Sequence, residues 1–119
     1  MSAIKRFEDI AIWKQARDLT VMIYAEFTNS KEYGFKDQIQ RASISIMNNI
    51  AEGYNRQSDK EFVKFLYYSK ASSSEVRSML QLAVDLNYLG KEKAKILISK
   101  TEMLAAGITN LIKYLNKVE

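Results

Sequence analysis

Cysteine, histidine and proline are all absent from this chain of 119 residues, and glycine occurs only four times. Without cysteine there is no disulfide or thiolate metal site, and without histidine the commonest metal ligand and acid–base group are missing. Without proline, and with so little glycine, the chain lacks the strongest helix breakers and the usual residues of β-hairpin turns. The sequence therefore favours helix throughout, and we expect no enzyme activity, no cofactor and no metal site.

Long hydrophobic runs are missing as well. The longest nearly apolar run, Leu19 to Ala25, is far shorter than the ~20 residues that span a bilayer. The first residues, Met1 to Arg6, lead into an amphipathic segment and not into the apolar core of a signal peptide. We therefore expect a cytoplasmic protein without membrane contact, folded as one domain over residues 1–119, since this length sustains a single hydrophobic core.

The composition of what remains is that of a globular protein, with 47% hydrophobic and 27% charged residues. Eighteen Lys and Arg against fourteen Asp and Glu give a formal charge of +4. A dedicated nucleic-acid binder usually concentrates its basic residues on one face. Here they are distributed along the chain, which is more typical of the solvated surface of a helical bundle.

Apolar residues recur at spacings of three and four in the first half of the chain, the pattern of one helical face. One such stretch runs from Phe7 to Phe27. Polar and turn-forming residues at 28–34 predict a connection, and a second helix begins at Phe35. This helix should end near Gly53-Tyr54-Asn55, because glycine and asparagine tolerate the left-handed conformation at helix C-termini.

The second half of the chain predicts two longer helices. Ser58-Asp59-Lys60-Glu61 fits a capping box, so a third helix should start there and continue to about Asn87-Tyr88-Leu89-Gly90. The fourth helix carries an unbroken apolar stripe from Ala94 to Val118. Short connections force neighbouring helices to run antiparallel, so we predict an all-α, up-down-up-down four-helix bundle.

Polar residues interrupt two of these helices. In the second helix Arg41, Ser45, Asn48 or Asn49, and Glu52 line one face. They are either the solvent side of the helix or a buried set whose members must pair, because an unsatisfied buried polar group costs about 1–3 kcal/mol. In the third helix, the serine-rich run 69–74 predicts a tight helix crossing, with hydroxyls bonded to carbonyls one turn back.

Aromatic and apolar residues exceed what one bundle needs. The tyrosines and Trp13 could stack on single-stranded nucleic acid, but on helices they are more often packing residues or interface anchors. Tyr67 and Tyr68 are adjacent, so they cannot share one helical face. The second helix carries a further apolar line, and the first adds Trp13, Val21 and Tyr24 outside its main stripe. This surplus predicts self-association.

Several short motifs resemble the four-helix bundle, 23S rRNA-intervening-sequence protein family. The most specific is Asn49-Ile50-Ala51-Glu52-Gly53 in the second helix. The other matching segments are Phe7-Glu8-Asp9-Ile10, Trp13-Lys14, Gln38-Ile39, Arg41-Ala42, Ser45-Ile46, Glu61-Phe62, Phe65-Leu66, Ser72, Glu75 and Asp85-Leu86 to Tyr88-Leu89. Where the family commonly has alanine and Gly-Ser, this chain has Ser69 and Ala71-Ser72, which puts the tightness of that helix crossing in question.

The resemblance implies a bacterial homopentamer, with five bundles around a central opening. Related accessory proteins of diversity-generating retroelements form similar barrels that contact nucleic acid and a reverse transcriptase. The family motifs also imply a structural polar set, in which Arg41 would pair with Glu75 or Glu52. The members of this set are Arg41, Ser45, Asn49, Glu52, Gly53, Ser72 and Glu75.

Two functions follow from these observations. In the first, a non-enzymatic oligomer presents basic and aromatic residues to RNA or single-stranded DNA, to a protein partner, or to both. The candidate contacts, either for nucleic acid or for a subunit interface, are Trp13, Lys14, Arg17, Tyr54, Arg56, Lys60, Lys64, Tyr67 and Tyr68. In the alternative, the protein is a scaffold that binds other proteins and never touches nucleic acid.

Overall fold

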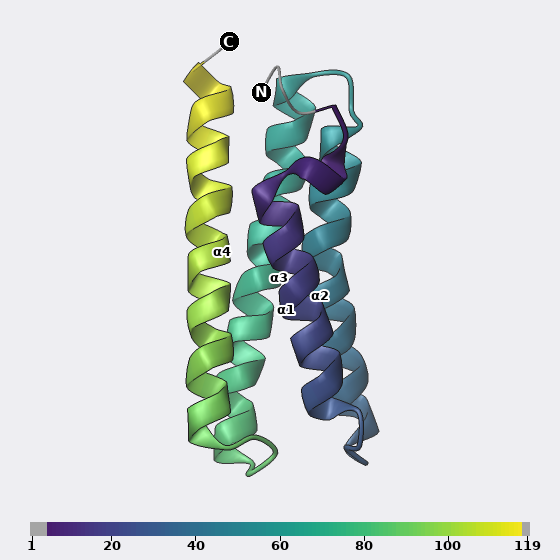
Figure 1. The fold of residues 1–119 in the computed structure, drawn as a ribbon, viewed down its shortest axis with the longest axis vertical. Helices are drawn as coiled ribbons and strands as arrows, with labels where there is room; N and C mark the ends of the chain where they lie inside the picture. Colours follow the sequence, from purple (N-terminus) through teal and green to yellow (C-terminus); the bar gives the residue numbers. More distant parts are fainter. Residues whose placement is uncertain (1–4, 118–119) are drawn as a thin grey trace.

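The computed structural model describes residues 5–117, and the predicted stripe residue Val118 lies outside them. Within this range the prediction of an all-α four-helix bundle is confirmed (Figure 1). A short 3₁₀ turn, η1, precedes four α-helices. Their bounds are η1 Phe7–Asp9, α1 Ala11–Phe27, α2 Tyr33–Tyr54, α3 Asp59–Asp85 and α4 Lys91–Lys117.

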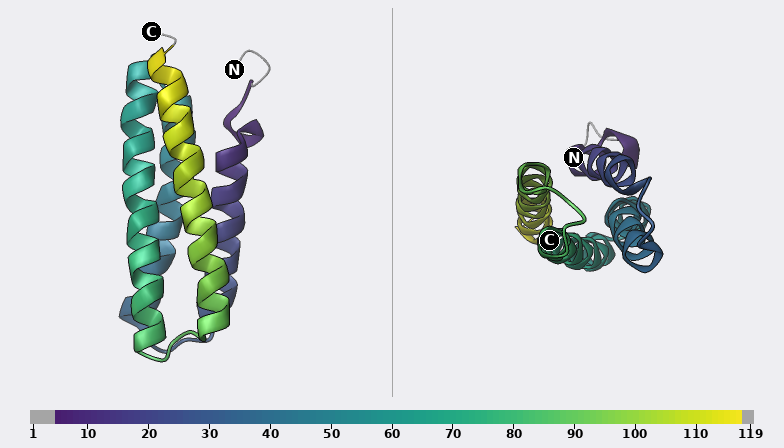
Figure 2. Two further views of the ribbon diagram at one scale, coloured as in Figure 1. Left: turned by 90° about the vertical axis from the view of Figure 1, so that its left-hand side faces the viewer. Right: turned by 90° about the horizontal axis from the view of Figure 1, so that it is seen from below.

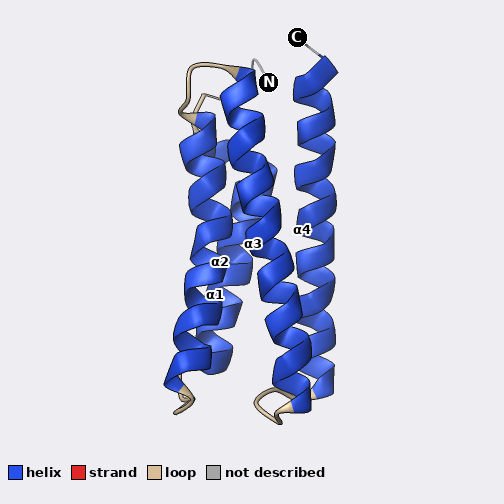
Figure 3. Ribbon diagram, turned by 180° about the vertical axis from the view of Figure 1, so that it is seen from behind, coloured by secondary structure: helices blue, strands red, loops and turns tan. Residues whose placement is uncertain are grey.

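Successive helices run in opposite directions and form a rod of 46 × 21 × 19 Å. Each helix packs against its neighbours in sequence, and α1 also meets α4, so α1 lies diagonally opposite α3 (Figure 2). The α1–α2 and α3–α4 connections lie at one end of the rod and the α2–α3 connection at the other (Figure 3). None of the helices in residues 5–117 combines the length and apolar character needed to cross a bilayer.

The predicted apolar stripes form the core. Ala16, Ile23, Ile39, Leu80 and Ile108 are fully buried along the axis of the bundle. The second apolar line of α2 is only half-buried, because Met47 and Ala51 pack at the margin of the core. Trp13 was expected outside the main stripe of α1, but it is buried within its own bundle.

The helix boundaries correct the sequence prediction in two places. The first helix begins at Ala11 and not at Phe7, because Ile10 is extended (ψ 126°) and separates α1 from η1. The second begins at Tyr33, two residues before the expected Phe35, so Gly34 lies in its first turn. The predicted cap of α3 is confirmed on its serine side: Ser58 Oγ accepts a hydrogen bond of 3.2 Å from the Glu61 N–H.

The left-handed helix end is found after α3 and not after α2. The second helix ends at Tyr54, as predicted, but Asn55 is right-handed (φ −80°) and Gly53 has no positive φ, so the left-handed conformation expected there is wrong. Asn87 has φ 62°, and the Tyr88 N–H donates back to the Ala83 carbonyl at 2.8 Å. This closure satisfies a carbonyl at the end of α3 and turns the chain towards α4.

A tyrosine joins the two connections at the same end of the rod. Tyr88 Oη donates a hydrogen bond of 2.6 Å to Glu32 Oε1 at the start of α2. The ring of Tyr88 also packs edge-on against Phe35 at 5.3 Å. The hydrogen bond, then burial and the carboxylate charge, raise the pKa of the Tyr88 phenol above its ordinary value of 10.0.

This bond predicts a tyrosine that titrates late. In an ultraviolet pH titration, the difference between wild type and Tyr88→Phe should show a phenol ionising above pH 10, and Glu32→Gln should return it towards the ordinary value. Because the folded pKa is raised, the stabilising effect is present below pH 10 and is lost as the pH rises through the raised value. A difference curve that Glu32→Gln leaves unchanged would contradict this assignment.

Candidate nucleic-acid interface

Most of the predicted polar set meets on the outer side of the α2–α3 contact. Ser45 Oγ and Ser72 Oγ are 2.9 Å apart, and Asn49 Nδ2 donates to the Ser45 carbonyl at 2.8 Å. One turn further along the same contact, Gln38 Nε2 donates to Glu75 Oε2 at 3.1 Å. Side chains 27 and 37 residues apart in sequence are thus hydrogen-bonded across the contact, and their role here is to hold the two helices together.

The predicted partners of Arg41 are wrong. Arg41 Nε pairs with Asp37 Oδ2 at 3.2 Å, one turn back on the same helix, and the arginine side chain is 79% exposed. Glu52 instead pairs with Arg56 at 2.8 Å. Both pairs are surface pairs at i,i+4 spacing, which stabilise a helix by about 0.3–0.5 kcal/mol. Arg41 is therefore a solvated residue of α2 and not part of a buried charge network.

Gly53 marks the closest approach of α2 to α3. A Cβ atom on this residue would lie 2.7 Å from Phe65 Cβ and 3.0 Å from Phe62 Cδ1. Phe62 is buried, and its ring packs edge-on against Tyr54 at 6.0 Å. The end of the Asn49–Gly53 string thus serves the packing of aromatic residues.

The serine-rich run of α3 is the tight crossing that was predicted, but its hydroxyls bond to neighbouring helices and not to their own. Ser69 Oγ donates to the Ile46 carbonyl at 2.7 Å, and Ser73 Oγ donates to the Thr101 carbonyl at 3.3 Å. Both serines are buried. In residues 5–117 no buried side-chain nitrogen or oxygen lacks a hydrogen-bond partner.

The candidate contacts on α1 are poorly placed to bind a nucleic acid. Trp13 is 8% exposed and packs edge-on against Phe7 at 5.3 Å, so its ring offers no free stacking face. Arg17 lies over the Trp13 ring at 5.2 Å and pairs loosely with Asp18 at 3.8 Å. Lys14 is exposed but stands on α1, diagonally across the bundle from the candidates on α3.

A second group of candidates clusters where α2 ends and α3 begins. The Arg56 guanidinium lies 4.6 Å above the Phe65 ring, and Phe65 meets Tyr68 edge-on at 5.6 Å. Tyr68 is 48% exposed and its neighbour Tyr67 53% exposed. Both tyrosines therefore leave surface open to a partner.

Charge is distributed unevenly over the helices, which corrects the expectation from sequence. Six lysines and two glutamates give α4 a formal charge of +4, equal to that of the whole chain, so the other residues balance to zero. All six lysines are exposed. Counting charge by predicted helix would have revealed this, whereas the search for motifs combining aromatic and basic residues drew attention to α1 and α3.

Four of the six α4 lysines face the side of the bundle that α4 shares with α3. Arg77 of α3 pairs with Glu102 of α4 at 3.5 Å, which fixes the position of this face on both helices. At 100° per residue, four of the six lysines lie within one quadrant of Glu102, and Lys70 lies close to the direction of Arg77. We call this surface the α3–α4 basic face; it comprises Lys60, Tyr67, Lys70, Arg77, Lys91, Lys95, Lys113 and Lys117.

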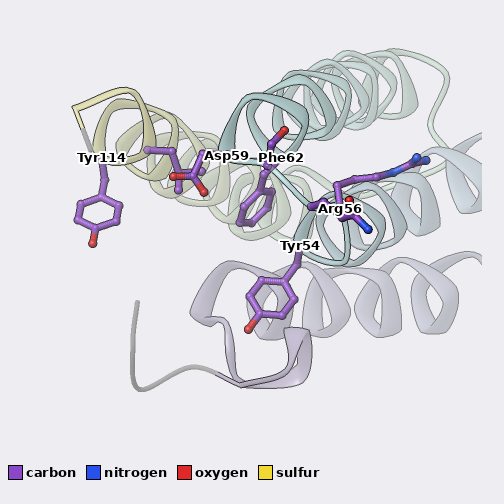
Figure 4. A pocket seen from close by; sticks show the side chains of 8 residues that line it. Tyr54, Arg56, Asp59, Phe62 and Tyr114 are labelled. Carbon is purple, nitrogen blue, oxygen red and sulfur yellow. The ribbon is translucent and has the colours of Figure 1, made fainter. Parts of the chain in front are cut away.

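A hollow of about 340 Å³ opens at the end of the rod where α2 ends and α4 stops (Figure 4). Tyr54, Arg56, Asp59, Phe62 and Tyr114 line it. Arg56 is held by Glu52 and Phe65, and the hydroxyl of Ser58 caps α3. Within residues 5–117 no three His, Cys, Asp or Glu residues gather closely enough to hold a metal ion.

The fold matches that of a solved structure. A crystal structure of a protein with unknown function from the S23 ribosomal protein family of Bacteroides thetaiotaomicron superposes with a TM-score of 0.81 at 23% sequence identity, covering 87% of this chain and 99% of that one. No curated protein matches the sequence.

The sequence itself matches a family over most of its length. The matched region, residues 8–110, begins before α1 and ends in the last part of α4, so it contains the polar set of α2 and α3. The chain is therefore a member of the 23S rRNA-intervening sequence protein family.

Proposed function

We propose that this protein is a non-enzymatic binding protein of the bacterial cytoplasm that assembles with copies of itself and binds RNA or single-stranded DNA through the α3–α4 basic face. The observation that carries the proposal is the concentration of the entire net charge of +4 on α4. Among the described residues, Lys93 is the α4 lysine that pairs with a carboxylate, Glu26, at 3.3 Å, and it points away from this face. The lysines of the basic face are thus available to phosphates.

The shape of the face suits an extended single strand. At 1.5 Å per residue, α4 presents its lysines along about 40 Å. Tyr67 is 53% exposed beside them and offers a ring on which a base can stack. Phosphate neutralisation combined with aromatic stacking is the usual mode of binding single strands without sequence preference.

Charge neutralisation on α4 tests the proposal. Labelled single-stranded RNA and DNA should bind at low salt, and the slope of log affinity against log salt should fall by about 3 when Lys91, Lys95, Lys113 and Lys117 are all changed to Gln, since each phosphate contact contributes about 0.7. The measurement is fluorescence anisotropy at several salt concentrations.

The matched control removes the same four charges elsewhere. Lys5, Lys14, Lys31 and Lys64, all exposed, are changed to Gln together, so two of the α1 and α3 candidates are tested in the same experiment. This variant should keep most of the salt slope. Equal losses of salt slope in both variants would mean that net charge alone drives binding. Absence of binding at low salt would leave the scaffold function, and the cluster of Arg56, Phe65 and Tyr68 would then be the expected contact for a protein partner.

A further inference from the structure

An apolar groove runs between α1 and α4. Its floor and walls are Met22, Ala25, Glu26, Lys93, Ile96 and Leu97, and its volume is about 290 Å³. Ile96 in the groove is 54% exposed, and Val21 of α1 and Met103 of α4 are 63% and 65% exposed. Exposed apolar side chains gathered in this way mark an interaction surface.

A second line follows α3 beside its contact with α2, with members at spacings of three and four: Phe65, Tyr68, Ser72, Glu75, Met79, Leu82 and Leu86. Its middle part is occupied, because Ser72 and Glu75 bond to side chains of α2 and Met79 is buried, whereas its end is apolar and exposed. Leu82 and Leu86 are 46% and 44% exposed at the end of α3. We call this line the α3 ridge.

The groove and the α3 ridge lie on opposite sides of the bundle. The helices follow one another around the bundle in chain order, so the α1–α4 side is opposite the α2–α3 side (Figure 2). Two complementary surfaces on opposite sides allow one copy to bind the next in the same way repeatedly, which gives a closed ring if the rotation between copies permits it.

Charge also fits this pairing. In the groove Glu26 pairs with Lys93. In the adjoining hollow Asp18 pairs with Arg17, which leaves Lys100, close to Ile96 of the groove, without an ion pair among the described residues. Beside the ridge, Asp85 is exposed and forms no ion pair within residues 5–117. An unpaired cation on one surface and an unpaired anion on the other favour a head-to-tail contact.

We infer that the α3 ridge of one copy packs into the α1–α4 groove of the next copy. This inference rests on the self-association in the proposed function and specifies which surfaces carry it. Leu82 and Leu86 enter the groove between Met22 and Ile96, and Asp85 approaches Lys100. The contact is heterologous, so every subunit uses both surfaces.

Two single-sided variants test this pairing. Ala25→Arg places a charged side chain in the groove, and Leu82→Glu places one on the ridge. Each variant alone should lose assembly, with an apparent dissociation constant raised at least about 100-fold, since an unpaired charge is forced into an apolar contact. Mixed in equal amounts, the two variants should form a heterodimer of twice 13.7 kDa, because one intact groove meets one intact ridge.

Light scattering measures the masses, and circular dichroism verifies that each variant is helical. Asn48→Arg and Gln81→Glu introduce the same charges at exposed positions off both surfaces and should assemble like wild type. Met103→Glu and Leu86→Glu repeat the test if either first variant does not fold. Wild type should form a closed oligomer, and five chains of 13.7 kDa would weigh 68.5 kDa.

The possible failures are distinguishable. A monomeric wild type would defeat the proposed self-association together with this inference. An oligomeric wild type whose Ala25→Arg and Leu82→Glu variants keep its mass would overturn the inference alone. Loss of assembly in Ala25→Arg but not in Leu82→Glu would mean that two grooves face each other, which also overturns the head-to-tail contact.

Discussion

Gly53→Ala should destabilise the protein by about 2 kcal/mol, although alanine is the better helix former by about 1 kcal/mol. The new methyl group would lie 2.7 Å from Phe65 Cβ, an atom next to the α3 backbone that no side-chain rotation moves away. To accommodate it, α2 and α3 must separate along their contact. The hydrogen bonds between Ser45 and Ser72 would be strained by the same movement.

Gly34→Ala is the matched control for this substitution. Gly34 also lies in α2, but a Cβ atom there meets nothing within 4 Å. It should be neutral or stabilising by up to about 1 kcal/mol, through helix propensity alone. In thermal unfolding followed by circular dichroism, Gly53→Ala should lower Tm by roughly 8 °C at about 4 °C per kcal/mol. Equal melting temperatures for the two variants would show that the α2–α3 contact relaxes freely.

Ser69→Leu should destabilise the bundle by about 3 kcal/mol, the upper part of the usual range for overpacking. Ser69 has no exposed surface, and its hydroxyl lies 2.7 Å from the Ile46 carbonyl oxygen of α2. A leucine there has to displace α2, and it also removes the hydrogen bond. Because α2 contacts both α1 and α3, its displacement should loosen the packing of most of the core.

Ser74→Leu provides the comparison for that variant. Ser74 is exposed on the same helix, five residues further along. Leucine is a slightly better helix former than serine, so stability there should change by no more than about 0.5 kcal/mol. Urea unfolding measures both values. A Ser69→Leu protein as stable as the Ser74→Leu protein would disprove the close crossing at Ser69.

The fold was predictable because apolar periodicity and short connections act locally along the chain. The stripes of all four helices, the cap at Ser58 and the antiparallel order followed from spacing alone. The helix boundaries near Phe7 and Tyr33 did not follow from spacing. A single extended residue such as Ile10 is itself apolar, so it does not interrupt the apolar pattern.

The candidate site was predictable only in part, because pairing across helices depends on distances that spacing does not contain. The sequence offers several carboxylates as partners for Arg41, and in the structure Arg41 pairs with Asp37 of its own helix at 3.2 Å. Trp13 was predicted to lie outside the core because apolar spacing does not show that the η1 turn places Phe7 against its ring. Tyr67 and Lys60, two of the candidate contacts, are exposed, while the lysines of α4 were not among the candidates because no motif contains them.

The buried hydroxyls fix the axial alignment of the helices. Apolar stripes repeat every turn, so on their own they would pack almost as well after one helix slid by about 5.4 Å. Thr20 bonds the Ser43 carbonyl at 3.1 Å, Ser69 that of Ile46 and Ser73 that of Thr101, one bond for each pair of helices adjacent in sequence. Sliding either helix of a pair would break the hydrogen bond that now joins them, although Thr20 also bonds the Ala16 carbonyl of its own helix at 2.8 Å.

The contact between α1 and α4 differs in this respect. Within residues 5–117 it has no buried hydroxyl bond of this kind, and its polar link is the Lys93–Glu26 pair at the surface. Its alignment depends on Ile12, whose Cγ2 would lie 2.8 Å from a Cβ atom on Gly107. Three of the four helix contacts are thus fixed by a buried hydroxyl, whereas the α1–α4 contact is fixed by side-chain packing and one surface ion pair. The helices α1 and α4 can therefore shift relative to each other, to fit a neighbouring molecule, without breaking a buried hydrogen bond between them.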